Sequence, residues 1–196
     1  MGNEINKLKK MIPKNKKTAY ISNALDYSKN LDRKKQSEQR NIRELTRVGL
    51  KVEILNLRDY FGKRKKLKKK IKEFGVIWVR GGNTFVLRQA MKLSGFDVIL
   101  KSMLKDNILY GGYSAGICVL APTLRGLELA DDPSSKPYGK KYETVWDGLG
   151  ILNYSIVPHY KSDHPESKMM NKVVKYMIDN KMLFKTLKDG EVIIIE

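Results

Sequence analysis

The chain is poor in the residues that form disulfides and metal sites. Its 196 residues include one cysteine, Cys118, and two histidines, His159 and His164. A single cysteine excludes a disulfide within the chain. The two histidines and the cysteine are spread over predicted loops and a helix, so the sequence predicts no cluster of metal ligands. We therefore expect neither a metal nor an organic cofactor.

Long apolar runs are also missing. No stretch approaches the ~20 apolar residues that a membrane-spanning helix needs, and residues 1–10 are polar rather than arranged as a secretion signal. With 41% hydrophobic residues, the chain is long enough to bury a continuous core. We expect one globular domain over residues 1–196, in the cytoplasm, with no membrane partner.

Acidic residues are scarce relative to basic ones, 21 against 39, which gives a net charge of +18. Such a surface attracts nucleic acids without sequence preference. Lysine supplies most of this charge, whereas the bidentate contacts that favour phosphates belong to arginine. In the densest basic run, residues 63–72, Leu67 and Ile71 recur at helical spacing. That pattern indicates a solvated helix face, so nucleic acid is not the favoured partner.

Apolar segments rich in β-formers alternate with helical patterns along the chain. Strands are predicted at residues 18–22, 52–57, 76–79, 108–111, 155–157 and 192–195. Helices are predicted at residues 29–48, 64–74, 84–92, 97–105 and 166–180. This alternation indicates βαβ units and a mainly parallel sheet with helices on both faces. Residues 131–147 are predicted to form a long loop, and long loops in compact domains tend to be functional.

The segment 110–116 has the pattern of a nucleophile elbow. Gly112 and Gly116 flank Ser114 at the second position on either side, as a sharp turn from strand to helix requires. Apolar residues before and after the segment supply that strand and helix. The alternative is a tight turn that packs a small residue without chemical role. A serine is a weak nucleophile until a base takes its proton and a third group orients that base.

His159 is the preferred base. It ends the apolar run 153–158, which places it at the carboxyl end of a predicted strand, where open α/β sheets carry their sites. His164 follows in a polar loop, and we expect it on the solvated surface. For the acid, Glu128, Asp131, Asp132, Glu143 and Asp147 all lie between the serine and the histidine, in the chain order of α/β-hydrolase triads.

These motifs together resemble the peptidase E family of serine peptidases, which includes aspartyl dipeptidases and, more distantly, cyanophycinase. Residues 77–85 are similar to its strand followed by Gly-Gly-Asn-Thr-Phe, residues 113–116 to its elbow, and residues 157–160 to its Pro-His-aromatic segment. The resemblance spans residues 17–181. It implies a flavodoxin-like three-layer α/β/α domain of the kind that class I glutamine amidotransferases have. The polar start of the chain departs from the family's apolar first strand and suggests an altered sheet edge.

The resemblance also implies roles for individual residues. Ser114 is the implied nucleophile and His159 the base, with the backbone N–H groups of Gly82 and Ala115 as the oxyanion hole. Aligning the family's acid loop on Pro133 favours Asp132 as the orienting acid. The segment between elbow and acid is longer than in the aspartyl dipeptidases, so Asp131 and Glu128 stay open, as does a serine-histidine dyad.

The sequence alone supports acyl transfer to water, and the resemblance supplies a short peptide as the substrate, with aspartate at its N-terminus. The second reading is an esterase or amidase that uses the same elbow on a non-peptide substrate. The third is a basic nucleic-acid-binding module without enzymatic activity, which predicts steeply salt-dependent binding and no reaction with serine-directed probes.

Overall fold

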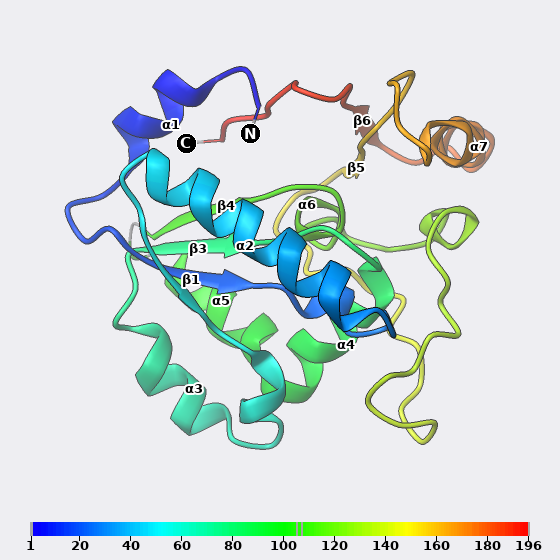
Figure 1. The fold of residues 1–196 in the computed structure, drawn as a ribbon. Coiled ribbons are helices and arrows are strands. Elements are labelled where there is room, and N and C mark those ends of the chain that lie inside the picture. Colours follow the sequence, from blue (N-terminus) through cyan, green and yellow to red (C-terminus); the bar gives the residue numbers. More distant parts are fainter. Residues whose placement is uncertain (1, 105, 107, 196) are drawn as a thin grey trace.

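A parallel four-stranded sheet forms the centre of the molecule, in the strand order β2-β1-β3-β4 (Figure 1). The computed structural model describes residues 2–104, 106 and 108–195. Two further strands, β5 and β6, pair in parallel with each other in a separate small sheet. The strands are β1 (Lys17–Ile21), β2 (Lys51–Ile54), β3 (Val76–Val79), β4 (Leu109–Gly112), β5 (Ser155–Val157) and β6 (Phe184–Thr186). The predicted α/β class and the mostly parallel central sheet are confirmed.

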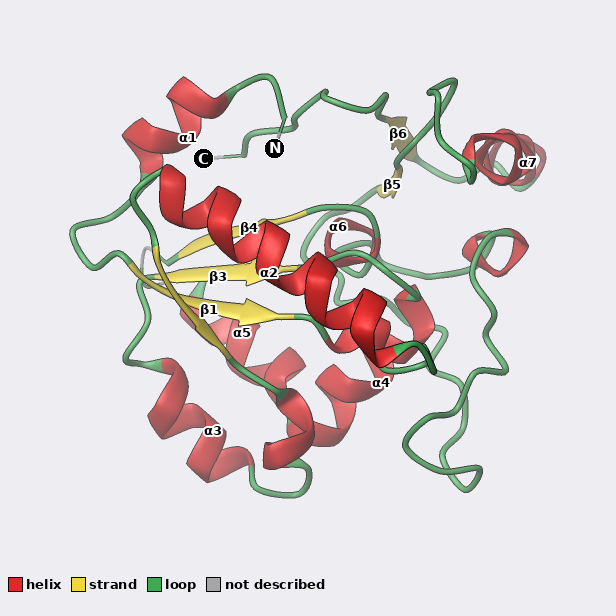
Figure 2. Cartoon of the chain, in the orientation of Figure 1, coloured by secondary structure: helices red, strands yellow, loops and turns green. Residues whose placement is uncertain are grey.

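Helices alternate with the strands along the chain (Figure 2). The helices are α1 (Ile5–Met11), α2 (Leu31–Arg47), α3 (Arg64–Ile71), α4 (Thr84–Ser94), α5 (Phe96–Met103), α6 (Ala115–Cys118) and α7 (Ser167–Asp179). Three short 3₁₀ turns join them: η1 (Asn23–Leu25), η2 (Leu57–Tyr60) and η3 (Leu127–Leu129). The five helices expected from apolar periodicity all form, with ends shifted by up to three residues. Residue 105, the predicted last residue of the helix 97–105, lies outside the described residues.

The strands bury both faces, because alternate side chains point to opposite sides of a sheet. On one side, Ala19 and Ile77 belong to a buried cluster that α3, α4 and α5 complete. On the other side, Tyr20 and Val76 pack with Leu45 of α2. Figure 1 shows α2 crossing the sheet on one face, with α3 and α5 on the other. The result is a helix–sheet–helix arrangement with the core on both faces of the strands.

The end of α2 explains how the chain turns back into the sheet. The N–H of Leu50 donates to the carbonyl of Leu45 at 3.2 Å, and that of Gly49 to Thr46 at 2.9 Å. Gly49 has a φ of 96°. These bonds form a Schellman motif, which needs a left-handed residue after the helix, and glycine adopts that conformation without a steric penalty. Gly49 therefore ends the helix just ahead of β2.

Two segments differ from the prediction. Residues 192–195 form no strand, although they are apolar and β-branched; they line a cleft beside β4 and have no strand partner in the described part of the chain. A strand needs a neighbouring ladder, which local propensity cannot supply. The small sheet instead uses β6, which the sequence did not predict. The polar start of the chain forms α1, and the N–H of Asn3 donates to the Gly190 carbonyl at 2.8 Å.

The long loop after α6 is fastened to the start of α4. The side chain of Asn83 caps α4 by accepting the Val86 N–H at 3.0 Å, and its amide donates to the Asp132 carbonyl at 2.8 Å. The carboxylate of Asp131 accepts the Thr84 N–H at 2.9 Å. Leading N–H groups of a helix lack partners within the helix and favour negative charge. The loop thus supplies two acceptors at the start of α4: the Asp131 carboxylate for the Thr84 N–H and the Asp132 carbonyl for the Asn83 side chain.

No helix among the described residues combines the length and the apolar character needed to cross a lipid bilayer.

Replacing Asp131 by asparagine should stabilise the protein at pH 7. Burial raises the pKa of Asp131 from 3.8 to about 6, although the hydrogen bond from Thr84 opposes the shift. Between these values the folded state holds a proton that the unfolded state has lost, so stability falls as the pH rises through this window. Asparagine keeps an acceptor for Thr84. We expect a gain of about 2 kcal/mol at pH 7, roughly 4–8 °C in Tm.

The measurement is thermal unfolding of the wild type and Asp131→Asn from pH 4 to pH 7. Exposed Asp132, whose pKa is lowered by its hydrogen bonds from Ser134, provides the control. Asp132→Asn should give no gain at pH 7. A lower Tm for Asp131→Asn than for the wild type at pH 7 would contradict the assigned direction of the shift.

Candidate active site

Ser114 lies at a strained turn between β4 and α6. Its backbone has φ 49° and ψ −123°, in a region that residues other than glycine rarely occupy. Two glycines make the turn possible, because a Cβ on Gly116 would lie 2.2 Å from the carbonyl oxygen of Val79, and one on Gly112 would lie 2.6 Å from it. The elbow therefore packs directly on the end of β3. Backbone strain of this kind is typical of functional sites.

Two tyrosine side chains hold the elbow from its sides. The hydroxyl of Tyr110 donates to the Gly116 carbonyl at 2.5 Å, and that of Tyr113 donates to the Asn41 side chain of α2. Burial raises the pKa of both tyrosines, so both hydroxyls keep their protons and act as donors. These bonds fix the turn to the sheet on one side and to α2 on the other.

The loop after β3 lies against Ser114. A Cβ on Gly81 would be 2.8 Å from the Cβ of Ser114. Gly82 has φ 143°, and a Cβ there would meet the Ala24 carbonyl oxygen at 2.5 Å, so only glycine fits. Ala115 is the first residue of α6, where N–H groups have no acceptor within the helix. Of the two residues expected to form an oxyanion hole, Ala115 thus follows the serine in the chain and Gly82 follows the glycine that lies against it.

His159 follows β5 and carries a hydrogen bond to an aspartate. Its backbone φ is 57°, its side chain is half-buried, and its Nδ1 lies 2.6 Å from Oδ1 of Asp189. The pairing of β5 with β6 continues toward these residues: the Leu187 N–H donates to Val157, and the Tyr160 N–H to Leu187. The Asp189 N–H also donates to Oγ of Ser162 at 2.8 Å. The backbone therefore sets the histidine and the aspartate side by side.

Ser114, His159 and Asp189 line one cleft of about 1010 Å³. Within the described residues no hydrogen bond joins the serine to the histidine; catalytic hydrogen bonds are often long before a substrate binds. β4, α1 and the segment 187–195 form the sides of the cleft. Its apolar lining includes Ile117, Leu120, Ile151, Leu152, Leu187 and Ile193. Arg40 and Lys188 add positive charge, opposed by four acidic side chains, Glu4, Glu44, Asp189 and Glu191.

The structure does not bring Asp132, the favoured acid, to the histidine. Its exposed carboxylate accepts the N–H and the hydroxyl of Ser134 at 2.9 and 2.6 Å, which lowers its pKa. The side chain therefore forms its hydrogen bonds within the local turn around Pro133. Asp132 contributes only its carbonyl to the site loop, through Asn83. Its predicted role as the orienting acid therefore has no contact of its carboxylate to support it.

The alternative acids are also engaged elsewhere or unpaired. Asp131 accepts from Thr84, although the charge of His159 contributes to lowering its pKa. Glu128 has one buried carboxylate oxygen without a partner in the described residues. Glu143 and Asp147 are exposed and bond to α4 through their backbone carbonyls. Sequence reasoning missed Asp189 because the search was limited to acids between the serine and the histidine, and no motif marks residue 189.

The two histidines lie together, contrary to expectation. The ring of His164 stacks on that of His159, with centroids 3.8 Å apart and an angle of 10° between the planes. Glu166 completes a group of three possible metal ligands. His164 is half-buried rather than solvated, because the loop 160–166 folds back over the end of β5. Cys118 is not part of this group; it is buried, and burial raises the pKa of its thiol, which disfavours the nucleophilic thiolate.

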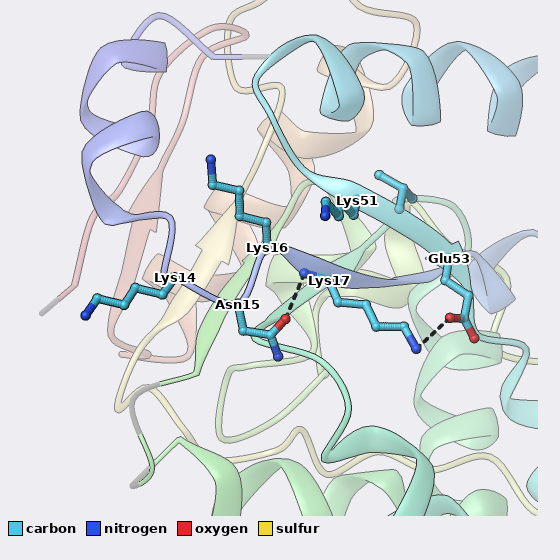
Figure 3. A pocket seen from close by; sticks show the side chains of 7 residues that line it. Lys14, Asn15, Lys16, Lys17, Lys51 and Glu53 are labelled. Carbon is cyan, nitrogen blue, oxygen red and sulfur yellow. Dashed lines mark hydrogen bonds and ion pairs between the residues drawn. The ribbon is translucent and has the colours of Figure 1, made fainter.

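A second hollow, of about 570 Å³, lies at the opposite edge of the sheet (Figure 3). It is lined by Lys14, Asn15, Lys16, Lys17, Lys51, Val52 and Glu53. Lys17 and Lys51 are paired at the amino ends of β1 and β2, whereas Ser114 follows the carboxyl end of β4. Lys17 forms an ion pair with Glu53 at 3.1 Å. This hollow has neither nucleophile nor base and is separate from the cleft.

Comparison with known proteins identifies relatives of this arrangement. The model of peptidase family S51 matches residues 3–196. An uncharacterized peptidase of Listeria innocua is 34% identical over 100 residues, which are 50% of this chain and 44% of that protein. Peptidase E of Citrobacter koseri is 34% identical over 91 residues, 46% of this chain and 36% of that protein. The matched segments thus span less than half the length of either relative.

Two solved structures share the fold of this protein over nearly its whole length. A crystal structure of a candidate peptidase E protein from Listeria monocytogenes superimposes with a TM-score of 0.70 at 20% identity, covering 95% of this chain and 85% of that one. A peptidase from an acI-B1 Actinobacterium gives 0.62 at 17% identity, covering 94% and 74%. At these identities the structures show a shared fold alone. The family model, which matches residues 3–196, shows that the chain belongs to peptidase family S51.

Proposed function

We propose that this protein is a serine peptidase that hydrolyses short peptides through an acyl-enzyme formed on Ser114. One observation carries the proposal: a serine held at positive φ on a strand-to-helix elbow lines the same cleft as a histidine whose other ring nitrogen is bound by a carboxylate. Family membership supplies the peptide as the class of substrate.

In this mechanism Oγ of Ser114 attacks the scissile carbonyl, and Nε2 of His159 takes its proton. The same nitrogen then donates the proton to the leaving amine. A water molecule, deprotonated by His159, next attacks the acyl-enzyme, and Ser114 leaves with the proton returned by the histidine. Asp189, 2.6 Å from Nδ1, keeps the proton on Nδ1 and so leaves Nε2 free to act as the base. The role of the acid is to hold the tautomer and stabilise the imidazolium.

The oxyanion that develops on the substrate is stabilised by the N–H groups of Gly82 and Ala115. Gly81 lies against Ser114, which brings the loop 81–83 to the serine, and Asn83 fixes that loop by capping α4. Donors that are fixed before the reaction stabilise the transition state without reorganising. Glycine at position 82 is required by packing in any case, because a side chain there would collide with Ala24.

For the acid, the contacts support Asp189 over Asp132. Asp189 is in hydrogen-bond range of His159, whereas the carboxylate of Asp132 is taken by Ser134. Asp131 is the second candidate, because it is buried and its pKa responds to the charge of His159. Its hydrogen bond to Thr84 would have to be exchanged for one to the histidine.

For the substrate, the finer proposal is a dipeptide with an N-terminal aspartate. Arg40 and Lys188 line the cleft with Ser114 and can attract the aspartate carboxylate. Arg80, which lies nearer in sequence to the Gly-Gly loop, is occupied: it donates to Gly81 and Ser37. The apolar lining of the cleft supports the alternative, an esterase or amidase that takes an apolar acyl group.

Replacing Ser114 by alanine should remove turnover and preserve the fold. Loss of a triad nucleophile costs at least ~10³-fold in kcat. Buried Cys118 lies four residues further on, so Cys118→Ser is the matched control and should keep its activity. The assay uses Asp-X, isoAsp-X and Leu-X dipeptides together with an apolar ester, on the wild type and both variants.

The finer proposal is supported if the protein hydrolyses Asp-X dipeptides and none of the other substrates. If only the ester is cleaved, and cleavage needs Ser114, the alternative replaces it. More than a tenth of the wild-type activity in folded Ser114→Ala would reject the nucleophile.

Asp189→Asn should lower kcat far more than Asp132→Asn does. The amide keeps the shape of the side chain but favours the wrong tautomer of His159, which costs up to about 10⁴-fold in a triad that depends strongly on its acid. Asp132→Asn should stay within about threefold of the wild type, and Asp131→Asn provides the comparison for a buried acid. The measurement is kcat over a range of pH, with circular dichroism as the check on folding. The opposite order of effects would return the orienting role to the loop 128–132.

A further inference from the structure

His159, His164 and Glu166 form a cluster of metal-ligating side chains at the edge of the cleft. One ligand atom of each residue lies within 4.8 Å of those of the other two. All three side chains are half-buried, and the imidazole rings are stacked 3.8 Å apart. Two imidazoles and a carboxylate are a donor set that proteins use for zinc, with the fourth position left to water or a substrate.

The hydrogen bonds around the cluster decide which ring nitrogen can bind a metal. In the described residues, Nδ1 of His159 is bound to Asp189, and Nδ1 of His164 accepts the Glu166 N–H at 3.2 Å. His159 therefore offers a free Nε2, whereas His164, whose Nδ1 accepts an N–H, carries the proton of its neutral ring on Nε2 and must shift that proton to bind a metal. A histidine that binds a metal usually has its other ring nitrogen on a carboxylate or backbone group, which fixes the tautomer. Asp189 already provides that support to His159.

We propose that this cluster binds a zinc ion and that the bound ion inhibits the enzyme. Ligands ~2.0 Å from a tetrahedral ion lie about 3.3 Å apart, so the three groups, now within 4.8 Å of one another, would close by about 1.5 Å. Because the two rings are stacked within 10° of parallel, the His164 ring must also rotate before both histidines can direct a nitrogen at one ion. His164 and Glu166 belong to the turn-rich segment between β5 and α7.

Inhibition is expected because the metal would bind Nε2 of His159. The base of the proposed mechanism is Nε2 of His159, and an ion on that atom prevents it from accepting the Ser114 proton. The inhibitory role therefore rests on the proposed function, whereas metal binding does not. The site uses His164 and Glu166, to which the proposed peptidase mechanism assigns no role.

Metal binding is tested on Ser114→Ala protein, which separates it from turnover. Zn²⁺ is titrated in competition with a chromophoric chelator, alone and with His164→Ala or Glu166→Gln added. We expect one Zn²⁺ per chain, with affinity reduced more than about 10-fold in each variant, the smallest effect expected for loss of an outer-shell partner. Asp163→Asn removes an exposed acid from the same loop and should leave affinity unchanged.

Equal zinc affinity in His164→Ala, Glu166→Gln and the parent protein would overturn the site, as would absence of binding. Thermal unfolding shows whether His164→Ala is folded. If it is not, the zinc affinity of Glu166→Gln alone tests the site.

Inhibition is tested by adding Zn²⁺ to the active wild-type protein and then removing it with a chelator. His164→Ala should keep its basal activity within about threefold and lose more than about 10-fold in sensitivity to zinc. Unchanged sensitivity would overturn the inhibitory role. A protein that binds zinc through this cluster but hydrolyses no substrate would reject the proposed function, and the inhibitory role with it, while the metal site stands.

Discussion

The carbonyl oxygen of Val79 is the point on which the site depends. It ends β3, accepts the Tyr113 N–H at 3.3 Å, and lies where any side chain on Gly112 or Gly116 would collide with it. This contact presses the elbow onto the sheet and forces Ser114 to positive φ, because the chain must turn within one residue to start α6. The same strand end leads into the loop of Gly81 and Gly82. One close approach thus arranges both the serine and the two segments whose N–H groups we propose as oxyanion donors.

The histidine side of the cleft is built separately. β5 and β6 form their own sheet, and backbone bonds beyond their ends align Leu187 with Val157 and Tyr160. That alignment puts Asp189 opposite His159 across two segments that are 30 residues apart in the chain. The cleft lies between the two sheets, so its geometry depends on how they pack together. The proposed zinc site lies on the histidine side alone, and therefore needs only the small sheet and the turns that follow it.

Part of the strong positive charge lies on surfaces outside the cleft. Lysines of α3 cover its exposed face, while Leu67 and Ile71 are buried. At the amino edge of the sheet, Lys17 and Lys70 share Glu53 and Glu73 in exposed ion pairs, which contribute little to stability. The cleft itself combines apolar walls with a few charges of both signs. The net charge of the chain therefore says little about its substrate.

The sequence by itself determined the elements and the elbow. Apolar strands, amphipathic helices and glycine at positions 49, 112 and 116 are local features. Their patterns predict β1, β3, β4 and β5, and the helices α2, α3, α4, α5 and α7, close to their observed ends, whereas α1 was not predicted. The family could be predicted for the same reason, since its motifs are short and contiguous. Two strand predictions were wrong. Residues 192–195 have high β-propensity but no neighbouring strand among the described residues, and β6 was not predicted because it has no strong local pattern.

Only the tertiary structure decided which acid meets the histidine. Asp132 was favoured because the loop around Pro133 could be aligned by sequence, but its carboxylate is satisfied locally by Ser134. Asp189 reaches His159 through the pairing of β5 with β6, and His164 reaches it through a folded turn. These contacts depend on how separate segments pack, and packing selects partners by shape and hydrogen bonding across space rather than by spacing along the chain.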